Sequence, residues 1–357
     1  TFNIILKFWR NKMKKQLLIA AVAATLGTSA MADISITGDA LVRFANTENG
    51  AAADTNSLDQ RVRLKMVGTS GDTSVTFALR NDNDDDAAAA GSTTAQSTRS
   101  TGTDKHLEVD YSYLTTKAGP VNIKVGEWWE TTGLGVARKG VGSGGNSINL
   151  STTISNVDLS VQGSAGNGST TVTAGTTIAG WKTVIEHDTA NNTGYTDVMV
   201  KGKIGPVNIA AEKYSSDAAT ADAGVVHVFG KVGGGVTLHA AYAEWENDQT
   251  AARAGNSKFS PLGVSVLGSA TGVNGNLALG NVNATDAQDE DVTGVRADFN
   301  VAGNAIQVAA GNLNAAGIDD GFADIIVTRD LSGAKLSLSA GQWNSNTSMG
   351  AKIAVKF

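Results

Sequence analysis

The sequence contains no cysteine, only three prolines and few charged side chains, and each shortage removes a class of protein. Without cysteine the chain can form no disulfide framework, no thiolate metal site and no cysteine nucleophile. Charged residues make up 17% of the 357 residues, below the usual level of about a quarter. Hydrophobic side chains nevertheless recur throughout, which does not fit a disordered polar chain.

Long apolar runs are also missing, apart from one near the beginning. After residue 32 no window holds 18 consecutive apolar residues, so no transmembrane helix is expected. The run from Leu17 to Leu26 follows Met13-Lys14-Lys15 and precedes small residues that end at Ala32. This order is typical of a secretory signal peptide. We therefore predict a signal peptide over 13–32 and a folded domain over 33–357, and we interpret 1–12 as an upstream extension of the gene, with a longer leader as the alternative.

The charge balance argues against nucleic acid as a partner. The chain carries 28 basic and 34 acidic residues. The expected leader contains basic residues and no acid, so the exported part is more acidic than the whole. Phosphates would be repelled by such a chain.

The sequence also lacks the spacings that mark enzymes and cofactor sites. The four histidines show neither HExxH nor i,i+4 spacing, and no nucleophile elbow occurs. The acidic run that begins at Asp82 lacks the glycine and glutamate of a calcium-binding loop. Gly140-x-Gly142-x-x-Gly145 has no following helical pattern to hold a nucleotide. We predict no enzyme activity, no catalytic residue, no metal site and no cofactor; each histidine is expected in an aqueous interior or at its rim.

What the sequence does show is alternation of apolar and polar residues with a period of two, which predicts β-strands. Val62, Leu64 and Met66 alternate with Arg61, Arg63 and Lys65. In the same way, strict alternation groups Tyr111 and Tyr113 with Val109 on an apolar face. Eighteen such segments are predicted: 34–45, 59–68, 73–81, 105–117, 121–128, 146–154, 157–165, 170–178, 181–188, 194–204, 207–214, 223–232, 236–245, 291–301, 304–313, 321–331, 334–343 and 347–357.

The connections between these segments alternate between tight turns and long loops. The short ones carry Gly, Asn, Asp and Pro, whereas 46–58, 82–104, 129–145 and 246–290 are long. This layout is typical of outer-membrane barrels. We predict an all-β fold, a transmembrane antiparallel up-and-down β-barrel of 16–18 strands preceded by a signal peptide. The alternative is an exported, surface-located β-rich adhesin or structural protein without a pore, in which the apolar faces would pack on each other.

Several short stretches carry a resemblance to a known family: the opening strand 33–38, Arg61-x-Arg63-x-Lys65, Tyr111-Ser-Tyr113-Leu114, Val125-Gly126-Glu127 and the apolar alternation that closes on Phe357. Over essentially all of residues 33–357 the chain resembles the general porins of Gram-negative outer membranes. The resemblance implies an outer-membrane location, a water-filled channel for passive diffusion of small hydrophilic solutes and ions, and a homotrimer in contact with outer-membrane lipids and lipopolysaccharide. It also implies that Phe357 is the signal read by the barrel assembly machinery.

The resemblance further implies that the loop at about 129–145 folds inward and narrows the pore. Opposed charges across such a gap select solutes by charge and size. The alternative is that these charges are ordinary solvated residues of the interior. The predicted pore-lining and constriction residues are Arg61, Arg63, Lys65, Arg80, Lys124, Glu127, Glu130, Arg138 and Lys139.

Overall fold

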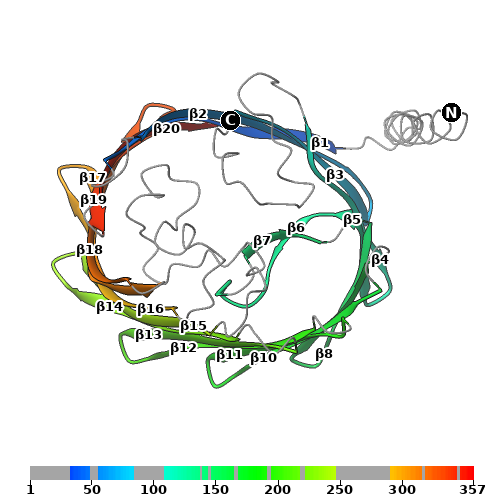
Figure 1. Ribbon diagram of the computed structural model, residues 1–357. Coiled ribbons are helices and arrows are strands. Elements are labelled where there is room, and N and C mark those ends of the chain that lie inside the picture. The colour runs from blue at the N-terminus through cyan, green and yellow to red at the C-terminus, as the bar shows by residue number, and fades with distance from the viewer. Residues whose placement is uncertain are drawn as a thin grey trace, which may run out of the picture.

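A computed structural model shows an all-β protein whose strands form one ring (Figure 1). It describes residues 33–48, 55–83, 108–136, 139–143, 146–164, 168–190, 194–217, 222–246, 290–315, 318–343 and 346–357. The predicted extension and signal peptide lie outside these residues. Among the described residues no helix has the length and hydropathy needed to cross a membrane.

Eighteen strands build the ring, and each overlaps one of the predicted segments. They are β1 (Asp33–Glu48), β2 (Thr55–Ser70), β3 (Thr73–Asn83), β4 (Glu108–Ala118), β5 (Val121–Glu127), β8 (Ser147–Ile154), β9 (Val157–Ser164), β10 (Thr170–Ile178), β11 (Trp181–Asp188), β12 (Tyr195–Ile204), β13 (Val207–Ser216), β14 (Asp222–Gly233), β15 (Val236–Glu246), β16 (Glu290–Val301), β17 (Asn304–Ala315), β18 (Ile318–Leu331), β19 (Ala334–Trp343) and β20 (Asn346–Lys356). The upper end of the predicted range of 16–18 strands is therefore the observed one.

Each ring strand pairs antiparallel with the next one along the chain, and β1 pairs with β20 to close the ring. At this seam Gly38 N donates to Phe357 O at 2.7 Å, and Phe357 N donates to Gly38 O at 3.0 Å. A Cβ on Gly38 would lie 2.5 Å from the Phe357 ring and 2.8 Å from the Arg63 carbonyl oxygen. A closed ring of strands leaves no unpaired edge. At the seam only glycine leaves enough space for the Phe357 side chain.

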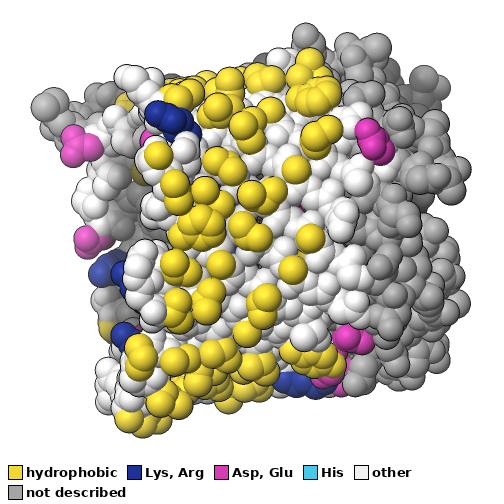
Figure 2. All heavy atoms as spheres, turned by 90° about the vertical axis from the view of Figure 1, so that its left-hand side faces the viewer, with side chains coloured by type: hydrophobic (Ala, Val, Ile, Leu, Met, Phe, Trp, Pro, Cys, Tyr) yellow, Lys and Arg dark blue, Asp and Glu magenta, His cyan; other side chains and the backbone are white. Residues whose placement is uncertain are grey.

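The outer face of the ring is apolar. Along the strands, one alternate set of side chains is both hydrophobic and exposed, as at Val42 (50%), Ile185 (47%) and Ile353 (48%). Figure 2 shows hydrophobic side chains as a broad band on one side of the barrel, with charged side chains at the margins of the band. The apolar faces therefore do not pack against each other in a dry interior, as the adhesin alternative would require. They form a surface suited to acyl chains.

Tight turns join the strands at one end of the barrel. Ser155, Ala179 and Ala302 have φ values of 58°, 50° and 50° there, and Ala179 and Ala302 are followed by Gly180 and Gly303, which also have positive φ. Such turns match the right-handed twist of hairpins. The strand ends that flank the longer connections lie at the other end of the barrel, in the alternation that the sequence predicted.

Two further strands lie inside the ring rather than in its wall. Trp129–Thr131 forms β6 and Lys139–Gly142 forms β7, and the two pair antiparallel. Figure 1 places both within the barrel. The sequence analysis expected an inward segment over 129–145 but did not include this short hairpin.

Candidate functional site: a constriction inside the barrel

Three arginines from neighbouring strands form a basic wall on the inside of the barrel. Arg61 and Arg63 lie on the polar alternation of β2, and Arg80 lies on that of β3. Arg61 pairs with Asp39 at 3.0 Å. Asp110 is shared, since Arg63 lies 3.0 Å and Arg80 3.6 Å from its carboxylate. Because three guanidinium groups share two carboxylates in these pairs, the wall keeps positive character toward the lumen.

Further basic residues extend this wall and two of them were not predicted. Arg43 on β1 is buried and stands directly opposite Lys352 on β20. Neither was singled out from the sequence, because their strands meet only when the ring closes. Lys65, which was predicted, lies farther along β2 beside Ala78, and no ion pair engages it among the described residues.

Lys124 on β5 is held by aromatic rings rather than by a carboxylate. Its Nζ lies 4.3 Å from the Tyr113 ring centroid and 4.2 Å from that of Trp128. Cation–π contacts of this kind hold an ammonium group in place without removing its charge. Lys124 therefore remains a positive group at the point where the chain leaves the wall and enters the lumen.

The entering segment is fastened to the wall by its first residues. Trp129 Nε1 donates to Asp110 at 3.0 Å, so the segment starts beside the basic wall. Glu130 accepts hydrogen bonds from Trp128 Nε1 at 3.3 Å and from Gln162 Nε2 on β9 at 2.8 Å. These two hydrogen bonds fix the Glu130 carboxylate inside the barrel, and its role at the constriction stays a prediction.

Beyond β6 the segment reaches the wall that lies opposite the arginines. Thr132 Oγ1 donates to Glu186 on β11 at 2.9 Å. The backbone N–H groups of Leu134 and Val136 both donate to the Glu212 carboxylate on β13, the latter at 3.2 Å. In the ring β13 lies half way round from β2 (Figure 1). The segment therefore spans from the basic wall to an acidic wall.

A buried carboxyl group beneath the segment explains why residue 133 is a glycine. Asp197 on β12 is 0% exposed. A Cβ on Gly133, whose φ is +55°, would lie 2.5 Å from Asp197 Oδ2 and 2.7 Å from Glu212 Cδ. Only a residue without a side chain permits this approach. We call Glu186, Asp197 and Glu212 the acidic dock; the sequence did not single out these three.

For the remaining predicted residues, Glu127, Arg138 and Lys139, the structure shows no side-chain contact at the constriction among the described residues. Glu127 ends β5, is exposed, and follows the same alternation as Val125, whose side chain is on the outer face. Lys139 begins β7, and its side chain, like all of Arg138, lies outside the described part of the structure. The roles of these three residues at the constriction stay predictions.

The histidines occupy different faces. His227 Nε2 and His239 Nδ1 face each other at 3.0 Å on the inner wall, and His239 Nε2 lies 3.2 Å from Asp298 and 3.2 Å from Arg296. His187 lies on the outward alternation of β11 and is exposed. His106 is outside the described residues. Within the described residues no group of three or more His, Cys, Asp or Glu side chains could hold a metal ion.

Taken together, these contacts place buried carboxyl groups on one side of the lumen and guanidinium groups on the other. The acidic dock is covered by the segment, since Glu212 is 4% exposed. The basic wall is more open, with the side chains of Arg61 and Arg63 exposed by 18% and 27%. A solute that passes between the segment and this wall therefore meets mainly positive charge.

Comparison with solved structures places the fold among porins. Acinetobacter baumannii OccAB4 matches with a TM-score of 0.62 at 12% identity, covering 92% of this chain and 99% of that one. A BenF-like porin from Pseudomonas fluorescens Pf-5 matches with a TM-score of 0.60 at 13% identity, over 92% and 100%. A triple mutant of the Rhodopseudomonas blastica porin gives 0.50 at 13% identity, over 91% and 100%. No family model and no curated protein matches the sequence.

Proposed function

We propose that the chain is a Gram-negative outer-membrane porin, a water-filled channel through which small hydrophilic solutes and ions diffuse passively. The observation that carries the proposal is the inward segment: it crosses an 18-stranded closed barrel and is hydrogen-bonded to the acidic dock. Barrels of roughly 16–18 strands are wide enough for an aqueous channel. No contact among the described residues favours the adhesin alternative.

The same geometry supports a preference for anions. The carboxylates of the acidic dock are buried under the segment, whereas Arg61 and Arg63 remain partly open to the lumen. Fixed charges that line a narrow aqueous gap concentrate ions of opposite sign. The constriction is therefore proposed to lie between the segment and the basic wall.

The finer resemblance to general porins adds partners to this proposal. A homotrimer, contacts with lipopolysaccharide and recognition of Phe357 by the barrel assembly machinery all come from that resemblance. Chemical cross-linking of the detergent-purified protein, followed by mass determination, tests the trimer; a monomer at all protein concentrations would contradict it.

Reversal potentials in a KCl gradient across planar bilayers test the channel and its preference. Wild-type protein is expected to conduct and to favour chloride. In the double variant Arg61→Glu, Arg63→Glu the reversal potential should move toward the equilibrium potential of potassium, because the substitutions reverse the charge of the two side chains. Arg329→Glu is the control, since Arg329 lies on the outward alternation of β18. Absence of conductance would overturn the channel; a variant that behaves as wild type would overturn the role of the wall.

A further inference from the structure

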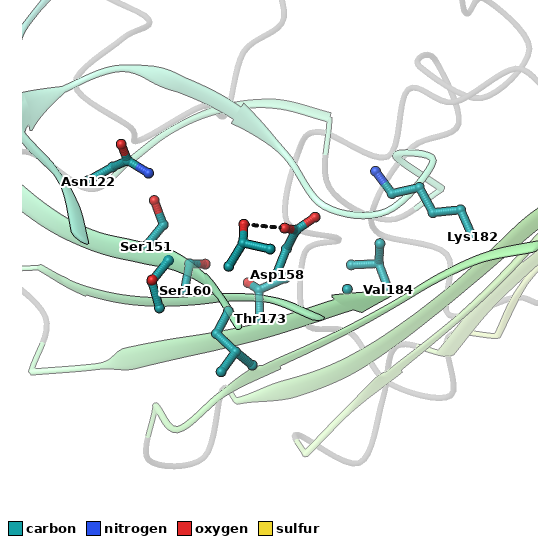
Figure 3. A pocket seen from close by; sticks show the side chains of 11 residues that line it. Asn122, Ser151, Asp158, Ser160, Thr173, Lys182 and Val184 are labelled. Carbon is teal, nitrogen blue, oxygen red and sulfur yellow. Dashed lines mark hydrogen bonds between the residues drawn. The ribbon is translucent and has the colours of Figure 1, made fainter. Parts of the chain in front are cut away.

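The inner wall carries a recess on the short-turn side of the constriction. It has a volume of about 320 Å³ and is formed by β5 and β8 to β11. Figure 3 shows Asn122 at one end, Asp158 near the middle and Lys182 at the other end. Volumes of about 300 Å³ and more are typical of sites for small ligands.

The floor of the recess is a row of polar side chains in direct cross-strand register. Asn122 stands opposite Ser151, Ser151 opposite Ser160, and Ser160 opposite Thr173. Thr173 in turn stands opposite Glu186 of the acidic dock and donates to it at 3.3 Å. The row therefore begins directly beneath the segment, where a solute leaves the constriction.

The recess is hollow because a second row of paired residues has a glycine, which has no side chain, in its middle. Asp158 pairs with Gly175, and Gly175 pairs with Val184. A side chain on Gly175 would meet Val184 at 3.5 Å and the Asp158 Cβ at 4.0 Å, so its absence leaves room between these two neighbours.

Two opposite charges line this space without pairing with each other. Asp158 accepts a hydrogen bond from Thr153 Oγ1 at 2.7 Å through Oδ1, which leaves Oδ2 available. Lys182 is exposed, and neither an ion pair nor a hydrogen bond engages its ammonium group among the described residues. They are the two charged residues of the lining, so the lining has no net charge.

From this arrangement we infer that the recess is a binding subsite for small zwitterionic solutes of the amino-acid type. The ammonium group of the solute meets Asp158, its carboxylate meets Lys182, and the hydroxyl and amide row accepts and donates the remaining hydrogen bonds. Charge-assisted hydrogen bonds at both ends favour a dipolar solute over an uncharged one of equal size. The subsite rests on the proposed function, since the solute reaches it through the channel.

L-serine and glycerol distinguish a zwitterion site from simple crowding of the pore, since they are similar in size. Single-channel conductance of the full chain is measured in dilute KCl while either solute is added. Serine should reduce conductance in a saturable manner, and glycerol should reduce it only in proportion to viscosity. Equal, non-saturating effects of both solutes would overturn the subsite and leave the channel intact. A saturable effect of glycerol alone would point to a polyol site and would also overturn it.

Variants at the two charges provide the second arm. Asp158→Asn and Lys182→Gln should each raise the half-saturating serine concentration by roughly fivefold, as expected for loss of one partly exposed ionic contact. Lys203→Gln is the matched control, because Lys203 lies near the same end of the barrel on β12 but outside the recess. Unchanged serine response in both variants would overturn the inference. Absence of any conductance in the wild type would overturn it together with the proposed function.

Discussion

Gly133 shows how a single residue sets the path of the segment. Its φ of +55° and the 2.5 Å separation between its would-be Cβ and Asp197 Oδ2 both exclude a larger residue. Gly133→Ala should therefore push the segment away from the acidic dock and change the single-channel conductance by a measurable step. Gly71→Ala is a matched control, because Gly71 has the same φ of +55° but open space around it. An equal effect of both variants on conductance would contradict the contact with the dock.

At the scale of residues, the sequence predicted some members of the site and could not predict others. Arg61, Arg63 and Arg80 could be found because each lies on the polar side of a clear alternation. Glu186, Asp197 and Glu212 lie on equally polar faces, but nothing local marks them as partners of a segment that precedes them by 50 residues or more. Only the closed ring brings these carboxylates to the segment.

Among the elements, the inward segment depends most on one side chain. Glu212 accepts hydrogen bonds from two backbone N–H groups of the segment, at Leu134 and Val136. Glu212→Ala should release this part of the segment, because the N–H groups of Leu134 and Val136 lose their acceptor, at a cost of about 1–3 kcal/mol for a donor that stays buried. Compared with the wild type, we expect this variant to show larger conductance steps with more current noise. Liposomes that contain it should also swell faster when they are placed in solutions of larger sugars. Lys213→Ala, an outward neighbour, is the control; identical behaviour of the two variants would argue against the tether.

A bulge in β4 explains where strict alternation gave a wrong placement. Leu79 pairs with Val109 and Ala78 pairs with Tyr111, so Asp110 is the extra residue on β4. The extra residue reverses the alternation, and Tyr111 and Tyr113 face the lumen instead of sharing the outer face with Val109. Tyr113 consequently reaches Lys124. Bulges redirect side chains in this way near functional sites, and a single sequence carries no reliable sign of them.

For the whole molecule, stability depends on closing the ring between β1 and β20. Gly38→Val would place side-chain atoms into the Phe357 ring and the Arg63 carbonyl, both less than 3 Å from the Cβ position. Gly68→Val meets no neighbour within 4 Å and serves as the control. We expect the first variant to yield less protein that resists unfolding in detergent, seen as a smaller folded band on an unheated gel. Equal folded fractions would contradict the importance of this seam.

The overall architecture could be predicted from sequence because a barrel repeats one simple rule. Every ring strand alternates apolar and polar residues, and every tight turn contains residues that tolerate positive φ, such as Gly180 and Gly303. The long connections were predicted only as loops, so the β6–β7 hairpin was missed: its pairing depends on surroundings inside the ring, and it has too few residues to show a period.

The register of the ring has a consequence for how the protein is made. Neighbours in space are neighbours in sequence at every strand pair except the one between β1 and β20. Hairpins can therefore be added one after another, each beside the last, and each step closes only the connection between two consecutive ring strands. Only the final pairing, between β1 and β20, joins distant parts of the chain. This last step decides whether the growing sheet closes into a barrel or stays open with two edge strands, whose unpaired N–H and C=O groups can bind other chains.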